Sequence, residues 1–208
     1  MHPELDRMLL DPDRIHARVV EVADELERAT PHDRPLTLVP VLTGGLIFAA
    51  DLMRCMDRPL RLHLITASSY PGTRTTPGRL RLGGGVDGDA AALAGRHVLL
   101  VDDILDSGQT LTAVRSALLR HDAASVRTCV LLRKEREAAR QTPVDHVAFD
   151  IPDAFVVGYG LDFNGYYRNL PGIGVLSQAA IDRGTPPPIP AQPARHSALT
   201  SHTFDRDT

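Results

Sequence analysis

One stretch of the chain, residues 98–117, limits the folds it can adopt more than any other. An apolar run ends in the adjacent acids Asp102 and Asp103, and a polar segment rich in small residues then reaches Thr110. Apolar residues follow from Leu111 onward at helical spacing. This order predicts a buried strand, a short loop and a helix, the unit from which α/β proteins are built.

The loop of this unit has the composition of an anion-binding site. Gly108 lets several backbone N–H groups point inward, and the dipole of the following helix adds partial positive charge. Ser107 and Thr110 add hydroxyl donors. Asp102 and Asp103 follow the apolar run, where the strand is expected to end, at the sheet edge where α/β proteins bind ligands. Because acids beside a phosphate site bind sugar hydroxyls, a metal ion or a proton, the pattern indicates a phosphorylated sugar.

Residues 102–110 resemble the 5-phosphoribosyl-1-pyrophosphate (PRPP) motif of the phosphoribosyltransferases. That motif has two acids, two apolar residues, an acid, Ser or Thr, Gly, any residue and Thr, and this chain matches every position. The alternatives are an ordinary βα turn with surface acids and a receiver-type phosphoacceptor, which does not explain the Ser-Gly-Thr loop. Relatives frequently carry lysine where this chain has Gln109. The resemblance implies that PRPP is bound by Asp102, Asp103, Asp106, Ser107, Gly108, Gln109 and Thr110.

Composition argues against several classes of function. The 208 residues suffice for one well-buried domain, and a hydrophobic content of 43% is ordinary for a soluble globular protein. A formal charge of −3 argues against nucleic acid or a membrane surface as a general partner. Without a signal-peptide pattern or a run long enough to span a membrane, we expect a cytoplasmic protein. Neither the histidines nor Cys55 and Cys129 have metal-ligand spacing, and we expect both cysteines to be buried and unpaired.

A second strand, loop and helix unit covers residues 36–56, with Thr43, Gly44 and Gly45 as its loop. Taken alone, this loop fits a tight turn and an anion site equally well. Residues 41–53 resemble the pyrophosphate loop of the hypoxanthine-guanine phosphoribosyltransferases. The resemblance implies that the backbone of the loop contacts pyrophosphate and that a cis peptide bond precedes Thr43. Thr43 itself departs from the basic residue that is frequent in that family.

The next segment is predicted to be a strand followed by an exposed loop. Residues 60–67 alternate basic and apolar side chains, which indicates a strand with one buried face. Residues 68–78 have the composition of a mobile loop, and residues 83–94 that of a further flexible connection. These residues alone favour an exposed hairpin tip. In the resembled family, a Ser-Tyr pair here lies on a lid over the reacting ribose, which implies that role for Ser69 and Tyr70.

Lys134 is the only lysine among the 23 Lys and Arg residues, and it follows a strand predicted over 125–132. Retention of one lysine suggests that a compact donor is required there instead of a planar guanidinium, although chance retention explains the composition as well. In the resembled family, a lysine at this place donates to the 6-oxygen of the purine, which implies that role for Lys134.

Residues 144–170 resemble the purine-binding segment of the same family. The resemblance implies that Phe155 stacks on the purine and that the backbone near Val156 and Asp162 accepts from the guanine 2-amino group. It also implies that Arg168 faces pyrophosphate and that Mg²⁺ is bound here. The implied metal ligands are Asp162, Asp102 and Asp103. Without the resemblance, the apolar centre of this segment predicts a buried core strand.

Together these motifs imply the type I phosphoribosyltransferase fold, an α/β fold with a central, mostly parallel sheet flanked by helices and a small hood. The expected domain covers residues 1–180, with its core at about 36–150 and its hood from 1–35 and 151–180. Residues 181–208 are rich in proline and are predicted to be a disordered tail.

The implied activity is purine salvage: transfer of the phosphoribosyl group from PRPP to hypoxanthine or guanine, giving IMP or GMP and pyrophosphate. Asp106 is the candidate general base at purine N7. The expected partners are the two substrates, Mg²⁺ and further copies of the chain in a homodimer or homotetramer, with no nucleic acid and no membrane. Two alternatives stay open. One is a preference for xanthine; the other is a nucleotide-responsive regulator of RNA or DNA, for which the basic residues around Lys134 form only a modest cluster.

Overall fold

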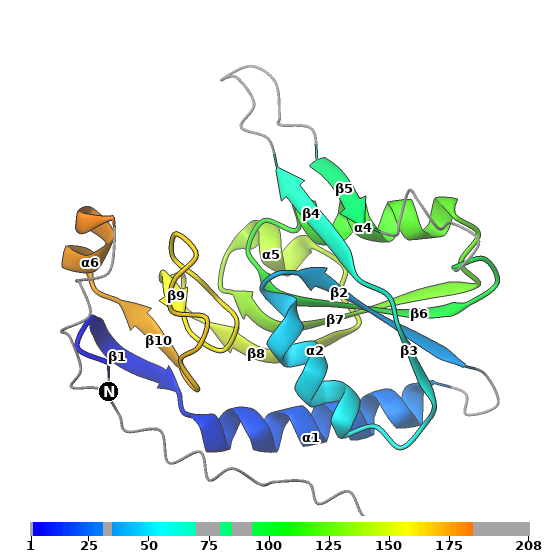
Figure 1. Ribbon diagram of the computed structural model, residues 1–208, viewed down its shortest axis with the longest axis horizontal. Coiled ribbons are helices and arrows are strands. Elements are labelled where there is room, and N and C mark those ends of the chain that lie inside the picture. The colour runs from blue at the N-terminus through cyan, green and yellow to red at the C-terminus, as the bar shows by residue number, and fades with distance from the viewer. Residues whose placement is uncertain (1, 31–34, 70–79, 85–92, 185–208) are drawn as a thin grey trace, which may run out of the picture.

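The computed structural model describes residues 2–30, 35–69, 80–84 and 93–184 (Figure 1). Within these ranges, seven strands form the main sheet in the order β5-β4-β2-β6-β7-β8, with β3 also paired to β2. All pairs in this sheet are parallel except β4 with β5. The strands are β2 (Leu36–Leu42), β3 (Leu60–Leu62), β4 (Ile65–Ser69), β5 (Leu80–Gly84), β6 (His97–Leu105), β7 (Ser125–Lys134) and β8 (His146–Ile151).

Helices cover both faces of this sheet (Figure 1). On β6, Leu99 and Val101 pack into the core cluster that includes α1 and α2, whereas Val98 and Leu100 pack into the cluster that includes α4 and α5. This alternation follows from the two-residue period of a strand. The helices are α1 (Pro12–Ala29), α2 (Gly45–Arg54), α4 (Gln109–Arg120) and α5 (Glu137–Gln141). The architecture confirms the predicted α/β fold with a central, mostly parallel sheet.

The two ends of the described chain meet in a small antiparallel sheet (Figure 1). Its described strands are β1 (Leu5–Leu10), β10 (Ile173–Leu176) and β9 (Val156–Val157), in that order. Buried Glu4 accepts a hydrogen bond from the Tyr167 hydroxyl and pairs with Arg183 of α6 (Gln178–Arg183). Helix α6 therefore includes residues that were expected to begin the tail, because Ser177 caps its start and Gly184 ends it with a left-handed backbone.

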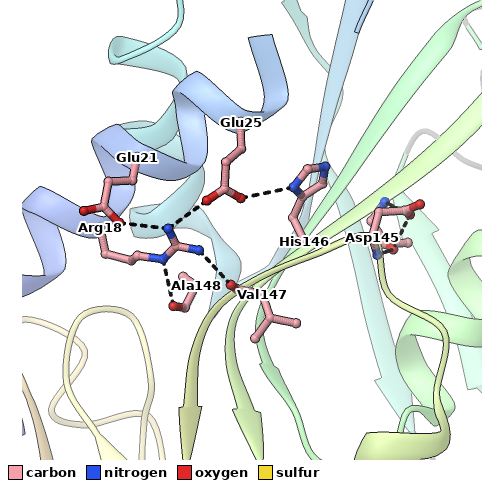
Figure 2. A network of polar contacts seen from close by, with 8 residues as sticks. Arg18, Glu21, Glu25, Asp145, His146, Val147 and Ala148 are labelled. Atoms are coloured by element: carbon pink, nitrogen blue, oxygen red, sulfur yellow. Dashed lines mark hydrogen bonds and ion pairs between the residues drawn. The ribbon is translucent and has the colours of Figure 1, made fainter. Parts of the chain in front are cut away.

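Helix α1 is joined to the edge strand β8 by a polar network (Figure 2). Arg18 donates to the carbonyl oxygens of Ala148 and Val147 at 3.0 and 3.2 Å. It also pairs with Glu21 at 2.9 Å and with Glu25 at 2.8 Å. Burial opposes ionisation of Glu25, but the hydrogen bond from Arg18 and its charge outweigh this effect and lower the pKa of Glu25. The guanidinium therefore occupies carbonyl groups of an exposed sheet edge.

We expect Arg18→Ala to lower the free energy of unfolding by about 1–2 kcal/mol, because charge-assisted hydrogen bonds to partly buried acceptors are lost. The lowered pKa of Glu25 stabilises the fold above the pKa of the unfolded chain, and this contribution disappears as pH falls through the folded-state pKa. Urea unfolding should therefore show a smaller difference between variant and wild type below about pH 4. Exposed Arg28 on the same helix gives the control variant Arg28→Ala; an equal loss there would contradict the role of the network.

The predicted strand over residues 60–67 is wrong in extent. β3 ends at Leu62 and β4 begins at Ile65, and the backbone N–H of His63 instead donates to Leu38 at 2.9 Å. Leu62 and Leu64 are 48% and 43% exposed, whereas Ile65 is buried, so the expected buried face is present only where β4 begins. The expected loop and connection are also shorter, because β4 continues through Ser69 and β5 includes residues 83–84.

Cys129 is buried, as predicted, but Cys55 at the end of α2 is only partly buried; both thiols are free. In the part of the chain that the structure describes, no helix is long and apolar enough to cross a membrane.

Candidate active site

The paired acids lie within β6, not beyond its end as expected. Asp102 and Ile104 pair with Val130 and Leu132 of β7, so the strand continues to Leu105. Burial raises the pKa of Asp102 well above its ordinary value, and the adjacent charge of Asp103 raises it further. Burial also raises the pKa of Asp103, although hydrogen bonds and the charge of Arg168 oppose this. The acids thus form a site prepared for a cation or for hydroxyl donors.

Asp102→Asn should stabilise the free protein at neutral pH. A raised folded-state pKa means that the folded protein binds the proton more tightly than the unfolded chain, so stability falls as pH rises from the ordinary value of 3.8 through the raised pKa. The variant removes this cost, and thermal unfolding should show a higher Tm at pH 7 but no gain at about pH 3. Asp24→Asn is the control, because Asp24 is exposed. A lower Tm for Asp102→Asn at pH 7 would contradict the conclusion that the buried charge of Asp102 destabilises the fold.

The predicted phosphate loop connects β6 to α4. Gly108 precedes the helix with φ of 75°, a left-handed conformation that favours glycine. A Cβ at Gly108 would lie 2.0 Å from Oγ1 of Thr142, so the loop also packs against the segment that follows α5. The loop is therefore held in a shape that leaves the N-terminus of α4 open to an anion.

The loop at residues 43–45, between β2 and α2, lies against the same acids. The peptide bond between Leu42 and Thr43 is cis, as the resemblance implies. A Cβ on Gly44 would lie 1.7 Å from Oδ2 of Asp103, so this contact requires glycine. On the other side, a Cβ on Gly160 would lie 2.4 Å from the carbonyl oxygen of Gly44. The loop is thus enclosed between β6 and the turn that begins at residue 158.

That turn presents Arg168 to the acids. The guanidinium pairs with Asp162 at 2.7 Å and donates to the carbonyl oxygen of Gly160 at 2.6 Å. Asp162 also accepts from the backbone N–H of Gly165 at 2.7 Å. The Tyr159 hydroxyl donates to Asp51 of α2 at 2.6 Å, which anchors the turn to the helix. The turn therefore offers a cation and a carboxylate to the same site.

A cavity of about 330 Å³ brings most of the predicted site residues together. Gly45, Gln109, Lys134, Phe155 and Val156 do not line it. Of the residues implied for the lid, Ser69 ends β4, whereas Tyr70 lies outside the described residues. The predicted residues that line the cavity are Thr43, Gly44, Asp102, Asp103, Asp106, Ser107, Gly108, Thr110, Asp162 and Arg168.

Of the residues implied for purine binding, Asp162 lines this cavity, whereas Lys134, Phe155 and Val156 do not. Lys134 ends β7 and pairs with Asp106 at 3.1 Å, although its side chain is only 9% exposed. Phe155 is 42% exposed and meets Phe163 edge to face, with ring centroids 5.4 Å apart. Val156 is buried in β9, as the apolar pattern indicates. Phe155 thus has an exposed ring available for stacking.

The sequence interpretation missed Arg136 and Asp153. Arg136 pairs with Asp106 at 2.7 Å and with Asp153 at 2.6 Å. Asp153 also lies 3.6 Å from Lys134. The available signal was the closeness of Arg136 to Lys134 in the sequence, because the chain turns tightly between the two residues.

A scan against known families identifies a phosphoribosyl transferase domain over residues 8–164. This match covers most of the chain, including β2, β6, both loops and the turn up to Asn164. The chain therefore belongs to the phosphoribosyltransferase family.

Individual relatives and solved structures show to which group of this family the chain is most similar. Hypoxanthine phosphoribosyltransferase of Haemophilus influenzae is 37% identical over 169 residues, covering 80% of this chain and 93% of its own. The hypoxanthine-guanine phosphoribosyltransferase of Aquifex aeolicus is 38% identical over 167 residues, covering 80% and 92%. The solved structure of hypoxanthine phosphoribosyltransferase from Trypanosoma cruzi, in complex with the product IMP, matches with a TM-score of 0.73 at 34% identity, covering 86% and 98%. Within its family, the chain groups with the hypoxanthine-guanine phosphoribosyltransferases.

Proposed function

We propose that this protein is a purine salvage enzyme that transfers the 5-phosphoribosyl group from PRPP to hypoxanthine or guanine, giving IMP or GMP and pyrophosphate. The observation that carries the proposal is one cavity in which an open helix N-terminus, a buried acid pair and Arg168 converge. These groups suit a phosphate, ribose hydroxyls and pyrophosphate respectively. The names of relatives at 37% and 38% identity support the same reaction.

In the proposed reaction, C1′ of the ribose loses pyrophosphate and bonds to a purine nitrogen. The loop from Asp106 to Thr110 binds the 5′-phosphate, and the backbone of loop 43–45 with Arg168 binds the leaving pyrophosphate. Asp102 and Asp103 accept from the ribose hydroxyls and stabilise the positive charge that develops on the sugar. Asp106 accepts the proton of the attacking purine at N7, which makes the ring more nucleophilic.

The acid pair also fits a divalent cation. Asp102 and Asp103 offer carboxylate oxygens whose pKa values are raised by burial, so a cation there would relieve an electrostatic cost. No cluster of three or more potential protein ligands occurs among the described residues. Mg²⁺ commonly binds through one or two carboxylates and takes its other ligands from water and substrate phosphates. We therefore propose that Mg²⁺ binds through one or two of the carboxylates of Asp102, Asp103 and Asp162; when bound, it would neutralise charge on the leaving pyrophosphate.

The test is steady-state conversion of hypoxanthine, guanine, xanthine and adenine in separate reactions with PRPP and Mg²⁺, followed by pyrophosphate release. Turnover of hypoxanthine or guanine, with adenine inert, is the expected result. Absence of turnover with every base, despite measurable PRPP binding, would overturn the proposal. Xanthine is included because a relative from Tritrichomonas foetus, 36% identical over 180 residues, is named a hypoxanthine-guanine-xanthine phosphoribosyltransferase.

Lys134→Ala should weaken binding of 6-oxopurines by roughly 10-fold to 100-fold, the cost of losing a charged hydrogen bond. Lys134 is proposed to donate to the 6-oxygen, which adenine lacks. The KM for PRPP should stay within about twofold, because the groups proposed to bind PRPP remain. Steady-state kinetics with each substrate varied in turn measures both effects; equal weakening of the two substrates would make Lys134 a structural residue.

The regulator alternative is less favoured by the structure. A nucleic-acid surface needs unneutralised cations. The basic cluster around Lys134 is instead paired with acids: Arg133 with Asp150 at 2.6 Å, Arg136 with Asp106 and Asp153, and Arg140 with Glu135 at 3.7 Å. RNA filter binding at moderate salt tests this alternative directly.

A homodimer or homotetramer remains part of the proposal. A solved structure of hypoxanthine phosphoribosyltransferase from T. cruzi addresses the role of its C-terminal region in oligomeric state and enzymatic activity. In this chain, Leu46 on α2 is 41% exposed and offers one apolar contact. Light scattering after size exclusion gives the state directly.

A further inference from the structure

Four charged side chains form a closed ring beside the proposed active site, here called the ion-pair ring. Asp106 lies 3.1 Å from Lys134 and 2.7 Å from Arg136. Asp153 lies 2.6 Å from Arg136 and 3.6 Å from Lys134. The ring therefore joins the phosphate loop to the segment that leads into β9, and its two cations balance its two anions.

The ring occupies both oxygens of Asp106. Lys134 Nζ lies at Oδ2, and Arg136 Nη1 donates to Oδ1. If the proposed function is correct, a bound purine needs Lys134 at its 6-oxygen and needs one oxygen of Asp106 at N7. If Lys134 turns to the 6-oxygen, Oδ2 becomes free to accept from N7, while Arg136 keeps its hold on Oδ1.

On the basis of the proposed function, we propose that Arg136 is a positioning residue. It holds the carboxylate of Asp106 toward the purine after Lys134 has turned to the base. Asp153 in turn holds Arg136 in place.

The backbone around Arg136 supports this role. β7 ends at Lys134, and the N–H of Glu135 donates to Ile151 at 2.8 Å, which continues the strand pairing. Arg136 is still extended, with φ of −116° and ψ of 147°, before α5 begins. The N–H of Arg136 donates to the carbonyl oxygen of Lys134 at 2.7 Å, and this tight turn around Glu135 places both side chains at Asp106.

An arginine is suited to this place. Its Nη1 donates to Asp106 while its Nε contacts Asp153, so one planar group fixes the distance between two segments. Lysine is a single point charge and would keep the attraction without the fixed geometry. The side chains of Arg136, Asp106 and Asp153 are 45%, 39% and 44% exposed, and such exposed pairs contribute little to stability. The expected effect of the contact is therefore on turnover.

The test compares kcat and KM of Arg136→Ala and Arg136→Lys with those of wild type, with hypoxanthine and PRPP varied in turn. Arg136→Ala should lower kcat by roughly tenfold or more and leave both KM values within about twofold. Arg136→Lys should recover part of the loss. Asp153→Asn, which removes the anchor, should give a smaller loss of the same kind.

Arg133→Ala is the matched control, because Arg133 pairs with exposed Asp150 and lies outside the ring. It should retain wild-type kcat, and all variants should keep the wild-type Tm. Full activity in Arg136→Ala, or a raised KM with unchanged kcat, would overturn the inference while leaving the proposed function intact. A wild-type protein that converts no purine would overturn both.

The departure of Lys134 can be observed separately. Because the chain has one lysine, selective isotope labelling of lysine gives a single side-chain NMR signal. Addition of IMP should shift this signal in wild type and in Arg136→Ala alike, because Arg136 is not needed for the exchange. An unchanged signal on saturation with IMP would overturn the proposal that Lys134 leaves Asp106 while Arg136 keeps its contact.

Discussion

Asp106→Asn should lower kcat by about 10²-fold or more while leaving the affinity for PRPP within about threefold of wild type. Asparagine keeps the shape of the side chain but cannot accept a proton from purine N7. The backbone of residue 106 remains in the phosphate loop, so binding of the 5′-phosphate should persist. The side chain of Asp106 is 39% exposed and lines the cavity, so a purine bound there can reach its carboxylate.

Single-turnover kinetics at saturating substrates, with PRPP binding measured by calorimetry, separates the two effects. Asp150→Asn is a suitable control, because this exposed acid pairs only with Arg133 among the ion pairs of the described residues. Lost PRPP affinity with unchanged turnover at saturation would mean that Asp106 binds PRPP and is not the base.

Gly44→Ala should lower kcat/KM for PRPP by about 10²-fold, because misplacement of binding groups by about 1 Å has effects of this size. The backbone of Gly44 is right-handed, with φ of −63° and ψ of −45°, so alanine causes no backbone strain there. The effect is steric: the added methyl would lie 1.7 Å from Oδ2 and 2.4 Å from Cγ of Asp103. Either the carboxylate or the pyrophosphate loop must move.

Gly95→Ala provides the control, since no atom of the described residues lies within 4 Å of its Cβ position. Its left-handed φ of 67° makes a modest loss of stability the expected result, with kcat/KM unchanged. Wild-type kcat/KM in Gly44→Ala would show that contact between the loop and Asp103 is not needed for catalysis.

Most of the candidate site could be predicted because its chemistry is local in sequence. The acids, the glycine and the hydroxyl residues of the phosphate loop follow one another within nine positions, 102–110. The cavity then brings this loop together with Thr43, Gly44, Asp162 and Arg168, as the motifs imply.

What could not be predicted depends on partners distant in sequence. β6 continues past its acids because β7 supplies backbone partners for Asp102 and Ile104, which polarity alone does not reveal. The break between β3 and β4 lies opposite Pro40 of β2, which has no N–H to donate across the sheet. The role of Arg136 depends on Asp153, which becomes its neighbour only when β8 pairs with β7.

The position of β6 between β2 and β7 ties the chemistry of the protein to its overall stability. Residues 97–101 have backbone partners on both sides, and their side chains pack into both core clusters. Amides in such a strand exchange with solvent only when the whole domain unfolds. Asp102 and Asp103 continue this strand, and Asp102 keeps a backbone partner on β7, so the acids belong to the same stable element. The part of the cavity that β6 forms is therefore expected to be among the last parts of the fold to open.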